Sequence, residues 1–378
     1  MKRLDLVYFD AGGGHRAAAT ALAMVIEKQV RPWEIRPVNL QDVLAPLDLI
    51  RKLTGVPTED FYNGMLKSGA TLGSGAALKI LHAITRGLHS SGVGLLEKYW
   101  RAREPDMVVS LVPNMNRVLG ESFARAYPGR PYVTILTDLA DYPPHFWMER
   151  QPQYFICGTQ RAVEQAHALG HDQGHVFRTS GMILHPRFYE AVIADRAVER
   201  QRLGLGAERP TALVLFGGHG SRVMKTIVER LDRSGLDLQL ILICGRNAKL
   251  ARTLREKKIR MPIFVEGFTK EIPYFMHLAD FFIGKPGPGS LSEAIAMRLP
   301  VIVECNAWTL VQERFNAAWV REQQIGIVLK NFRGIAAAVE ESLRPGVLAR
   351  FRENEARLEN RAVFEIPEIL EKILSAPT

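Results

Sequence analysis

The sequence predicts an α/β protein with two domains, each built on a doubly wound parallel sheet. Short runs of β-branched and aromatic residues alternate with helical stretches along the chain, which is typical of parallel strands joined by helices that cover both faces. The alternation restarts near Pro210, and a glycine-rich turn follows the first strand of each half. At 378 residues the chain can hold two separate cores.

The first half begins with a strand in LDLVYF, followed by the turn and helix of GGGHRAAATALAMVIEKQ. Further strands are expected in EIRPVNL, MVVSLVP, YVTILTD and YFICGT, and in the second half in TALVLFGG, LQLILICG, PIFVEGF, DFFIG and PVIVE. We expect a Rossmann-like domain over residues 1–185, a second one over 186–360, and a terminal amphipathic helix over 361–378. That helix is a candidate to pack back on the first domain.

Composition and charge restrict the class of protein. Apolar residues make up 47% and charged residues 24% of the chain, as in ordinary globular proteins. The three cysteines show no CxxC spacing, so we expect a reducing cytoplasm, no disulfide and no zinc site. No apolar run approaches the roughly 18–20 residues that span a bilayer. Because Asp10 interrupts the short apolar start, we do not expect a signal peptide there.

Basic residues exceed acidic residues by nine, a balance that suits an anionic membrane or phosphorylated substrates. Nucleic acid is disfavoured, because the chain has no Arg/Lys-rich tract and no aromatic pattern typical of RNA binding. A basic, helical insert over about 48–103 interrupts the first domain. It fits either an ordinary helix packed on the sheet or a helix pair lying on anionic headgroups.

Three loops and one residue pair are the candidates for binding a ligand and for catalysis. The first loop, FDAGGGHRAAATA, fits either a structural turn or a phosphate cradle. His15 and Arg16 depart from the GxGxxG pattern, which disfavours NAD. The second loop, LFGGHGS, also follows a strand.

The third loop, GKPGPGSLSEA, predicts a turn and then a helix opened by Ser290 to Ser292, whose N–H groups could hold a diphosphate. Glu293 is expected in the first turn of that helix, either as a ribose ligand or as a simple helix-start charge. Gln312 and Glu313 in WTLVQERFN fit either sugar recognition or a solvated helix start.

Taken together, these stretches resemble the GT-B glycosyltransferases of the group that contains the monogalactosyldiacylglycerol synthases. Bacterial diacylglycerol glucosyltransferases and the N-acetylglucosaminyltransferase of peptidoglycan synthesis belong to the same wider group. The resemblance rests on DAGGGHRAA, FYNGMLKSG, TDLADYPPHFW, LILICGRNAKL, VEGF, GKPGPGSLSEA and VQERFN, which follow the family's order from residue 10 to about 316.

The resemblance implies roles for individual residues. His15 would be the catalytic base or a donor-phosphate contact between the domains, and Asp138 would orient or share that proton transfer. Whether His15 or Asp138 is the base stays open. The remaining implied residues would bind the donor: Gly14, His185, Gly217, Gly218, His219, Val265, Phe268, Gly287, Pro288, Gly289, Ser290, Glu293, Gln312 and Glu313. Val265 and Phe268 would frame the uracil, and Glu293 would bind the ribose.

Three departures from the family's pattern are visible. The family's KAGPGT reads KPGPGS here, which keeps the turn and the hydroxyl. His185 stands where the plant enzymes have an arginine, and His219 interrupts the second glycine loop.

The resemblance implies an inverting hexosyltransferase that moves galactose or glucose from a UDP-sugar to a lipid hydroxyl, diacylglycerol in the first place. It would associate peripherally with the inner face of the cell membrane. An imidazole with an ordinary pKa near 6.5 can accept the proton at neutral pH. Because helix N-termini can hold the leaving diphosphate and the chain has no Asp-x-Asp, no metal or other cofactor is expected. Two alternatives remain: a UDP-N-acetylglucosamine-dependent transferase with another acceptor, and a non-catalytic nucleotide-sugar-binding protein. The oligomeric state is not predicted.

Overall fold

The computed structural model describes residues 1–10, 13–47, 89–142 and 144–376. The chain divides into two compact units. Unit 1 holds the described residues up to Pro186 and those from Asn360 onward, and unit 2 holds Arg187–Glu359. Residues 51–103 of the basic insert are the candidate for contact with a membrane. Of these, residues 51–88 lie outside the described residues.

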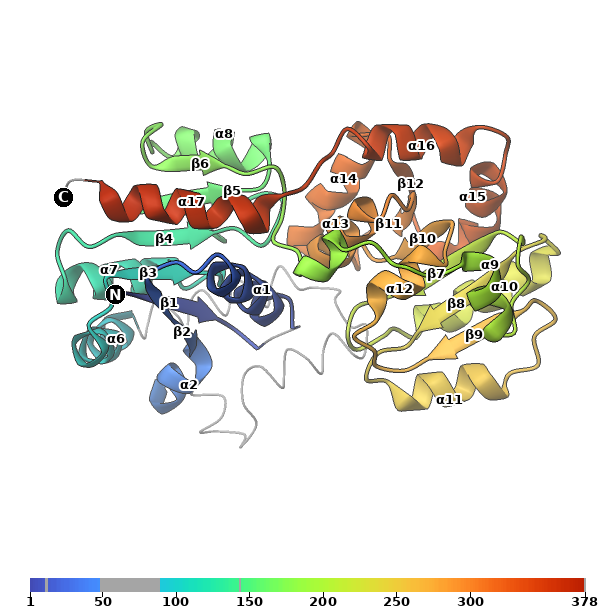
Figure 1. Ribbon diagram of the computed structural model, residues 1–378, viewed down its shortest axis with the longest axis horizontal. Coiled ribbons are helices and arrows are strands. Elements are labelled where there is room, and N and C mark those ends of the chain that lie inside the picture. Colours follow the sequence, from blue (N-terminus) through green and yellow to red (C-terminus); the bar gives the residue numbers. More distant parts are fainter. Residues whose placement is uncertain (11–12, 48–88, 143, 377–378) are drawn as a thin grey trace. The chain divides into compact units, whose positions relative to one another are not determined.

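Unit 1 is a parallel six-stranded sheet with helices on both faces (Figure 1). The strand order is β2-β1-β3-β4-β5-β6. The strands are β1 (Lys2–Tyr8), β2 (Trp33–Asn39), β3 (Met107–Ser110), β4 (Tyr132–Ile135), β5 (Tyr154–Cys157) and β6 (Val176–Arg178). The helices are α1 (Gly14–Lys28), α2 (Leu40–Leu44), α6 (His89–Arg103), α7 (Asn116–Ala126), α8 (Gln160–Ala168) and α17 (Ala362–Ser375), with 3-10 turns η1 (Ala45–Leu47) and η2 (Pro186–Tyr189) at the unit's edges.

Alternating side chains of the central strands of unit 1 enter two different cores. Leu4 and Leu6 face the layer formed by α1 and α17, whereas Val7 faces the layer formed by α6 and α7. This follows from the period of two in a strand, which sends successive side chains to opposite faces. Within the insert, α6 buries Trp100 completely against this second layer, so residues 89–103 form an ordinary packed helix.

Unit 2 repeats this architecture with the strand order β12-β11-β10-β7-β8-β9, again all parallel. The strands are β7 (Thr211–Leu215), β8 (Gln239–Ile243), β9 (Ile263–Glu266), β10 (Phe281–Gly284), β11 (Val301–Glu304) and β12 (Gly326–Leu329). The helices are α9 (Arg196–Arg202), α10 (Val223–Ser234), α11 (Ala248–Glu256), α12 (Ile272–His277), α13 (Pro288–Ala296), α14 (Arg314–Glu322), α15 (Ile335–Ser342) and α16 (Val347–Glu355), with 3-10 turns η3 (Val311–Glu313) and η4 (Phe332–Gly334).

The expected fold class is confirmed, with three differences in detail. Strands β6 and β12 were not expected from the sequence, and each closes one edge of its sheet. Helix α13 begins at Pro288 rather than at Ser290. Proline suits the first helical position, because its missing N–H has no partner there in any case and its φ is already helical. Glu293 therefore lies in the second turn, and the expectation that it occupies the first turn was wrong.

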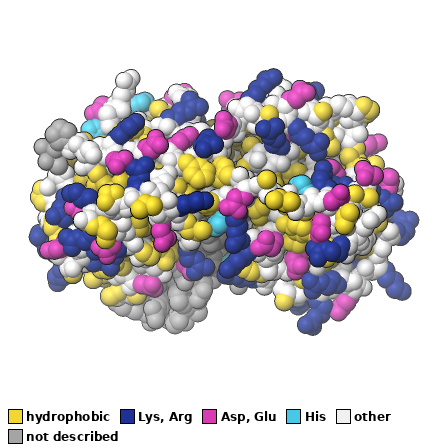
Figure 2. All heavy atoms as spheres, viewed as in Figure 1, with side chains coloured by type: hydrophobic (Ala, Val, Ile, Leu, Met, Phe, Trp, Pro, Cys, Tyr) yellow, Lys and Arg dark blue, Asp and Glu magenta, His cyan; other side chains and the backbone are white. Residues whose placement is uncertain are grey.

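Basic side chains occur on both units. On the face shown in Figure 2, Lys and Arg side chains are spread over both units among Asp and Glu side chains. Within the described ranges, no helix is long and apolar enough to cross a membrane.

Candidate functional site

Each sheet has one point at which the chain reverses the direction in which it adds strands. In unit 1 this switch point lies between β1 and β3, and in unit 2 it lies between β7 and β10. Ligands of open α/β sheets bind at the carboxyl ends of the strands beside such a point. The loops at this edge of each sheet are therefore candidates for ligand binding, and each unit is described by itself.

In unit 1, His15 lies at this edge, in the first turn of α1, the helix that follows β1. Gly13 precedes the helix with a φ of +80°, a left-handed conformation that glycine adopts without strain. Gly14 is the first residue of the helix and is exposed. The imidazole Nδ1 of His15 lies 3.0 Å from Oγ1 of Thr137, which follows β4. The ring thus reaches across the ends of the neighbouring strands.

The environment of His15 favours its neutral form. Desolvation lowers the pKa of this imidazole from 6.5 to about 4, and a hydrogen bond to the backbone of Leu111 opposes the fall. Leu111 follows β3 directly, so the opposing contact also comes from the switch point. At neutral pH the ring is uncharged and has one nitrogen able to accept a proton.

Asp138 and His15 share the neighbour Trp147. The indole Nε1 of Trp147 donates a 2.9 Å hydrogen bond to Oδ2 of Asp138, which is buried. The centre of the same indole lies 6.0 Å from that of the His15 ring. Thr137, the other contact of His15, is the sequence neighbour of Asp138. The structure thus brings the two expected catalytic residues into one cluster and adds Trp147 and Thr137, which the sequence analysis did not select.

His185, by contrast, is half-buried in the segment that leaves unit 1, one residue before η2.

In unit 2, the loop after β7 is closely packed against the loop after β8. Gly217 and Gly220 have φ values of +72° and +61°, and a Cβ on Gly220 would lie 2.6 Å from the carbonyl oxygen of Cys244. The Gly218 carbonyl accepts a 2.9 Å hydrogen bond from the backbone N–H of Arg246. His219 lies in this loop and is half-buried. Only glycine permits this approach of two backbones, which fixes the shape of the loop.

The amino end of α13 faces the same edge, since α13 follows β10. Its N-cap is Gly287, and no side chain caps the helix. Pro288 has no N–H, and the first N–H groups of a helix have no partner inside the helix. The N–H groups of Gly289 and Ser290 and the positive end of the helix dipole are therefore suited to an anion.

Glu293 projects from the next turn of α13 and is half-buried. No hydrogen bond or ion pair of its carboxyl group with another described residue is present. Desolvation raises the pKa of this carboxyl to about 7. The oxygens of this carboxyl group can form hydrogen bonds with the hydroxyl groups of a ligand.

The pair Gln312–Glu313 forms the end of η3, before α14. Glu313 is buried, and its Oε1 is 2.5 Å from Nζ of Lys285, the first residue after β10. Gln312 is half-buried. Lys285 belongs to the loop GKPGPGSLSEA, but the sequence alone assigns it no role. Its contact with Glu313 makes it a candidate site residue.

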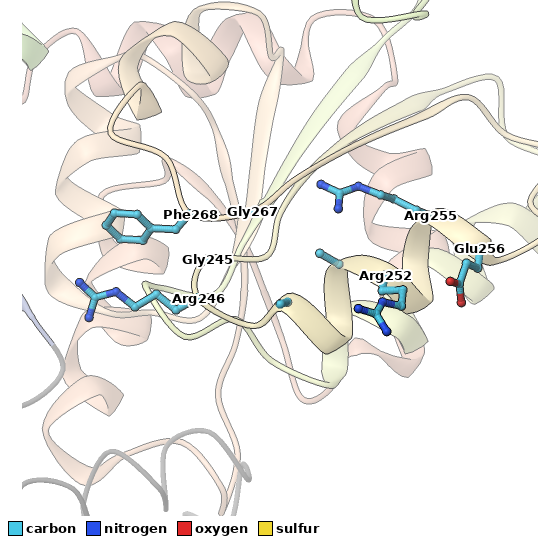
Figure 3. A pocket seen from close by; sticks show the side chains of 9 residues that line it. Gly245, Arg246, Arg252, Arg255, Glu256, Gly267 and Phe268 are labelled. Atoms are coloured by element: carbon cyan, nitrogen blue, oxygen red, sulfur yellow. The ribbon is translucent and has the colours of Figure 1, made fainter.

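A cavity of about 500 Å³ lies beside Phe268, between the loops after β8 and β9 and the helix α11 (Figure 3). The Phe268 ring is exposed, and the Arg246 guanidinium lies 4.8 Å from its centre. Val265 does not line this cavity: its side chain belongs to the core of unit 2, and its carbonyl accepts a 2.9 Å hydrogen bond from Arg255. Phe268 therefore offers an aromatic face for a nucleotide base. Val265 packs in the core beneath the cavity and does not line it.

No group of three or more His, Cys, Asp or Glu side chains able to hold a metal ion occurs in the part of the chain that the structure describes.

Comparisons with known proteins place this geometry in context. No family model matches the chain. The chain is 27% identical over 366 residues to monogalactosyldiacylglycerol synthase of Spinacia oleracea, and the match covers 91% of this chain and 66% of that protein. It is 28% identical over 392 residues to a probable monogalactosyldiacylglycerol synthase 3 of Oryza sativa subsp. japonica, with 97% and 73% covered.

Solved structures agree on the fold. MurG of Acinetobacter baumannii matches with a TM-score of 0.62 at 12% identity, covering 98% of this chain and all of that one. MnaA of S. aureus, solved with UDP, matches with a TM-score of 0.61 at 16% identity over 100% and 99%. HepE of Anabaena, solved with UDP-glucose, matches with a TM-score of 0.56 at 14% identity over 98% and 99%. The chain thus has the fold of the GT-B glycosyltransferases and is similar in sequence to the monogalactosyldiacylglycerol synthases.

Proposed function

We propose that this protein is an inverting glycosyltransferase that transfers a hexose from a UDP-sugar to a lipid hydroxyl, with diacylglycerol as the acceptor. The observation that carries the proposal is the edge of the second sheet. There the N–H groups at the start of α13 suit a diphosphate, and the carboxyl group of Glu293 suits the hydroxyls of a ribose. Phe268 offers an aromatic face for the base.

The edge of the first sheet supplies the base for the reaction. The neutral imidazole of His15 accepts the proton of the acceptor hydroxyl as its oxygen attacks C1 of the sugar. The bond between C1 and the diphosphate oxygen breaks on the opposite face, so the configuration at C1 inverts and UDP leaves. The N–H groups of α13 stabilise the charge that develops on the leaving diphosphate. Asp138 fixes Trp147, whose indole borders the His15 ring.

A lipid acceptor is supported by the names of relatives that match this chain over 91% and 97% of its length, which are monogalactosyldiacylglycerol synthases. The excess of nine basic residues suits a protein that works at an anionic surface. We therefore propose a peripheral association with the membrane and a site that receives the lipid hydroxyl beside His15.

The test is an incubation of the full chain with UDP-galactose, UDP-glucose or UDP-N-acetylglucosamine and vesicles that contain diacylglycerol. Mass analysis of the extracted lipids and measurement of released UDP follow. We expect a hexosyl-diacylglycerol and equimolar UDP with one of the two hexose donors. Consumption of none of the three donors would overturn the proposal.

His15→Asn should lose turnover by a factor of about 10² to 10⁴, the usual contribution of a general base, while it still binds UDP. His167→Asn is the matched control, because His167 lies exposed on α8 and its Nδ1 lies 2.8 Å from the His171 carbonyl oxygen, away from the His15 cluster. Equal loss of turnover in both variants would remove His15 from the mechanism.

A further inference from the structure

Lys285 lies where the two glycine loops of unit 2 converge. It is the first residue after β10, one of the two strands at the switch point. A Cβ placed on Gly287 would come within 3.1 Å of Cε of Lys285, and one placed on Gly217 within 3.9 Å of the same atom. The lysine side chain therefore runs between the loop after β7 and the amino end of α13.

The ammonium of Lys285 is held in place by Glu313. Nζ lies 2.5 Å from Oε1 of Glu313, and that carboxylate is buried. A buried carboxylate that lost its cation would be strongly destabilising, so the pair restrains both partners. An ammonium has three N–H donors and can serve a carboxylate and a phosphate at once.

The backbone beside Lys285 is fixed as well. Asn316 is fully buried on α14, and its Nδ2 donates a 2.8 Å hydrogen bond to the carbonyl of Pro286. Its Oδ1 is buried without a hydrogen-bond partner among the described residues. Lys285 is thus a fixed positive charge next to N–H groups that suit an anion.

We propose that Lys285 binds the diphosphate of the donor and neutralises it as UDP departs, and that Glu313 is a positioning residue for this lysine. Glu313 then does not recognise the sugar, the role that the family resemblance implied for it. This inference rests on the proposed function for the identity of the ligand, a nucleoside diphosphate. The fixed ammonium supplies the charge stabilisation that leaving-group departure requires.

The test measures binding of UDP, uridine, inorganic pyrophosphate and a UDP-hexose to the full chain by calorimetry. Lys285→Ala should lower the affinities for UDP and pyrophosphate by about ten- to a hundredfold, the range of a charge-assisted hydrogen bond. The affinity for uridine should stay within about twofold of its original value. Lys258→Ala is the matched control, since Lys258 is exposed and has no carboxylate within 4.0 Å among the described residues. It should change none of the four affinities.

Glu313→Gln separates positioning from sugar recognition. If Glu313 positions Lys285, the substitution lowers the affinities for UDP and UDP-hexose by the same factor. In a protein that already carries Lys285→Ala, it causes no further loss of affinity. If Glu313 contacts the sugar, only the UDP-hexose affinity falls, and it falls in both backgrounds. The Lys285→Ala/Glu313→Gln variant also removes the orphaned buried charge, so it reports on binding even where Lys285→Ala alone does not fold.

The outcomes distinguish this inference from the proposed function. UDP binding that depends on Lys285, without transfer of sugar from any donor, supports the inference and overturns the transferase. Sugar transfer with unchanged UDP and pyrophosphate affinity in the lysine variants overturns the inference and leaves the transferase standing. Absence of UDP and pyrophosphate binding in the unmodified protein overturns both.

Discussion

The neutral imidazole of His15 yields the most direct prediction. The fall of its pKa from 6.5 to about 4 corresponds to about 3.4 kcal/mol in favour of the uncharged ring, at 1.36 kcal/mol per pKa unit. Because the folded-state pKa is depressed, this stability is present above pH 6.5 and is lost as the pH falls from 6.5 towards 4. At pH 5.5 about 97% of His15 should be neutral, against about 9% for an unperturbed imidazole.

The assay is a titration of the protein labelled with ¹⁵N in histidine, followed through the ring nitrogen shifts. The chain has ten histidines, and a difference spectrum against His15→Asn identifies the resonances of His15. We expect neutral-ring shifts for His15 at pH 5.5, where an unperturbed imidazole is mostly imidazolium. Imidazolium shifts for His15 at that pH would refute the argument that burial dominates its environment. The acid limb of kcat/KM should likewise lie well below pH 6.5 if His15 is the base.

Three further predictions concern unit 2. Gly287→Ala should displace the Lys285 side chain, because the new Cβ would lie 3.1 Å from Cε. Calorimetry should then show several-fold weaker UDP binding with little change in stability. An unchanged affinity for UDP would contradict this prediction. Glu293→Gln should reduce the preference for UDP over 2′-deoxy-UDP by about tenfold, whereas an equal loss for both nucleotides would exclude a contact with the ribose 2′-hydroxyl. Glu355 is buried, both its carboxyl oxygens lack partners in the described chain, and desolvation raises its pKa to about 9. The free energy of unfolding that the neutral Glu355 carboxyl contributes is therefore lost as the pH rises from 4.5 towards 9. Glu355→Gln should reduce the dependence of the free energy of unfolding on pH, measured in urea, by about 1.4 kcal/mol per pH unit. The same pH dependence in both proteins would refute this prediction.

Local sequence patterns were sufficient for most of the fold. Strands such as β8 are continuous apolar runs, which is typical of a strand buried on both faces. β6 has only three residues, and β12 begins with a glycine and is half-buried throughout. Short edge strands of this kind have no periodicity to detect, because their pairing with a neighbouring strand defines them.

The turn before α13 could be predicted from its own glycines and proline, whereas its role as a diphosphate site stays a prediction. Contacts between distant segments could not be predicted in this way. Trp147 meets His15 only because β4 and β1 end at the same edge of the sheet. Glu313 pairs with a lysine 28 residues earlier in the chain, and nothing in either segment alone indicates that its carboxylate is already bound. This contact is the reason for proposing that Glu313 positions Lys285 instead of recognising the sugar.

The packing of α17 has a consequence for synthesis of the chain on the ribosome. Ile366, Leu370 and Ile373 of this last helix complete the same core as Leu22 and Ile26 of α1, and α17 lies along α1 in unit 1 (Figure 1). Unit 2 ends at Glu359, so all of its residues emerge before the first unit can finish its core. The apolar face of α1 is covered only after α17 has been translated. During that interval the side chains of α1 that pack against α17 stay uncovered, and a chain that terminates after unit 2 leaves the core of unit 1 incomplete.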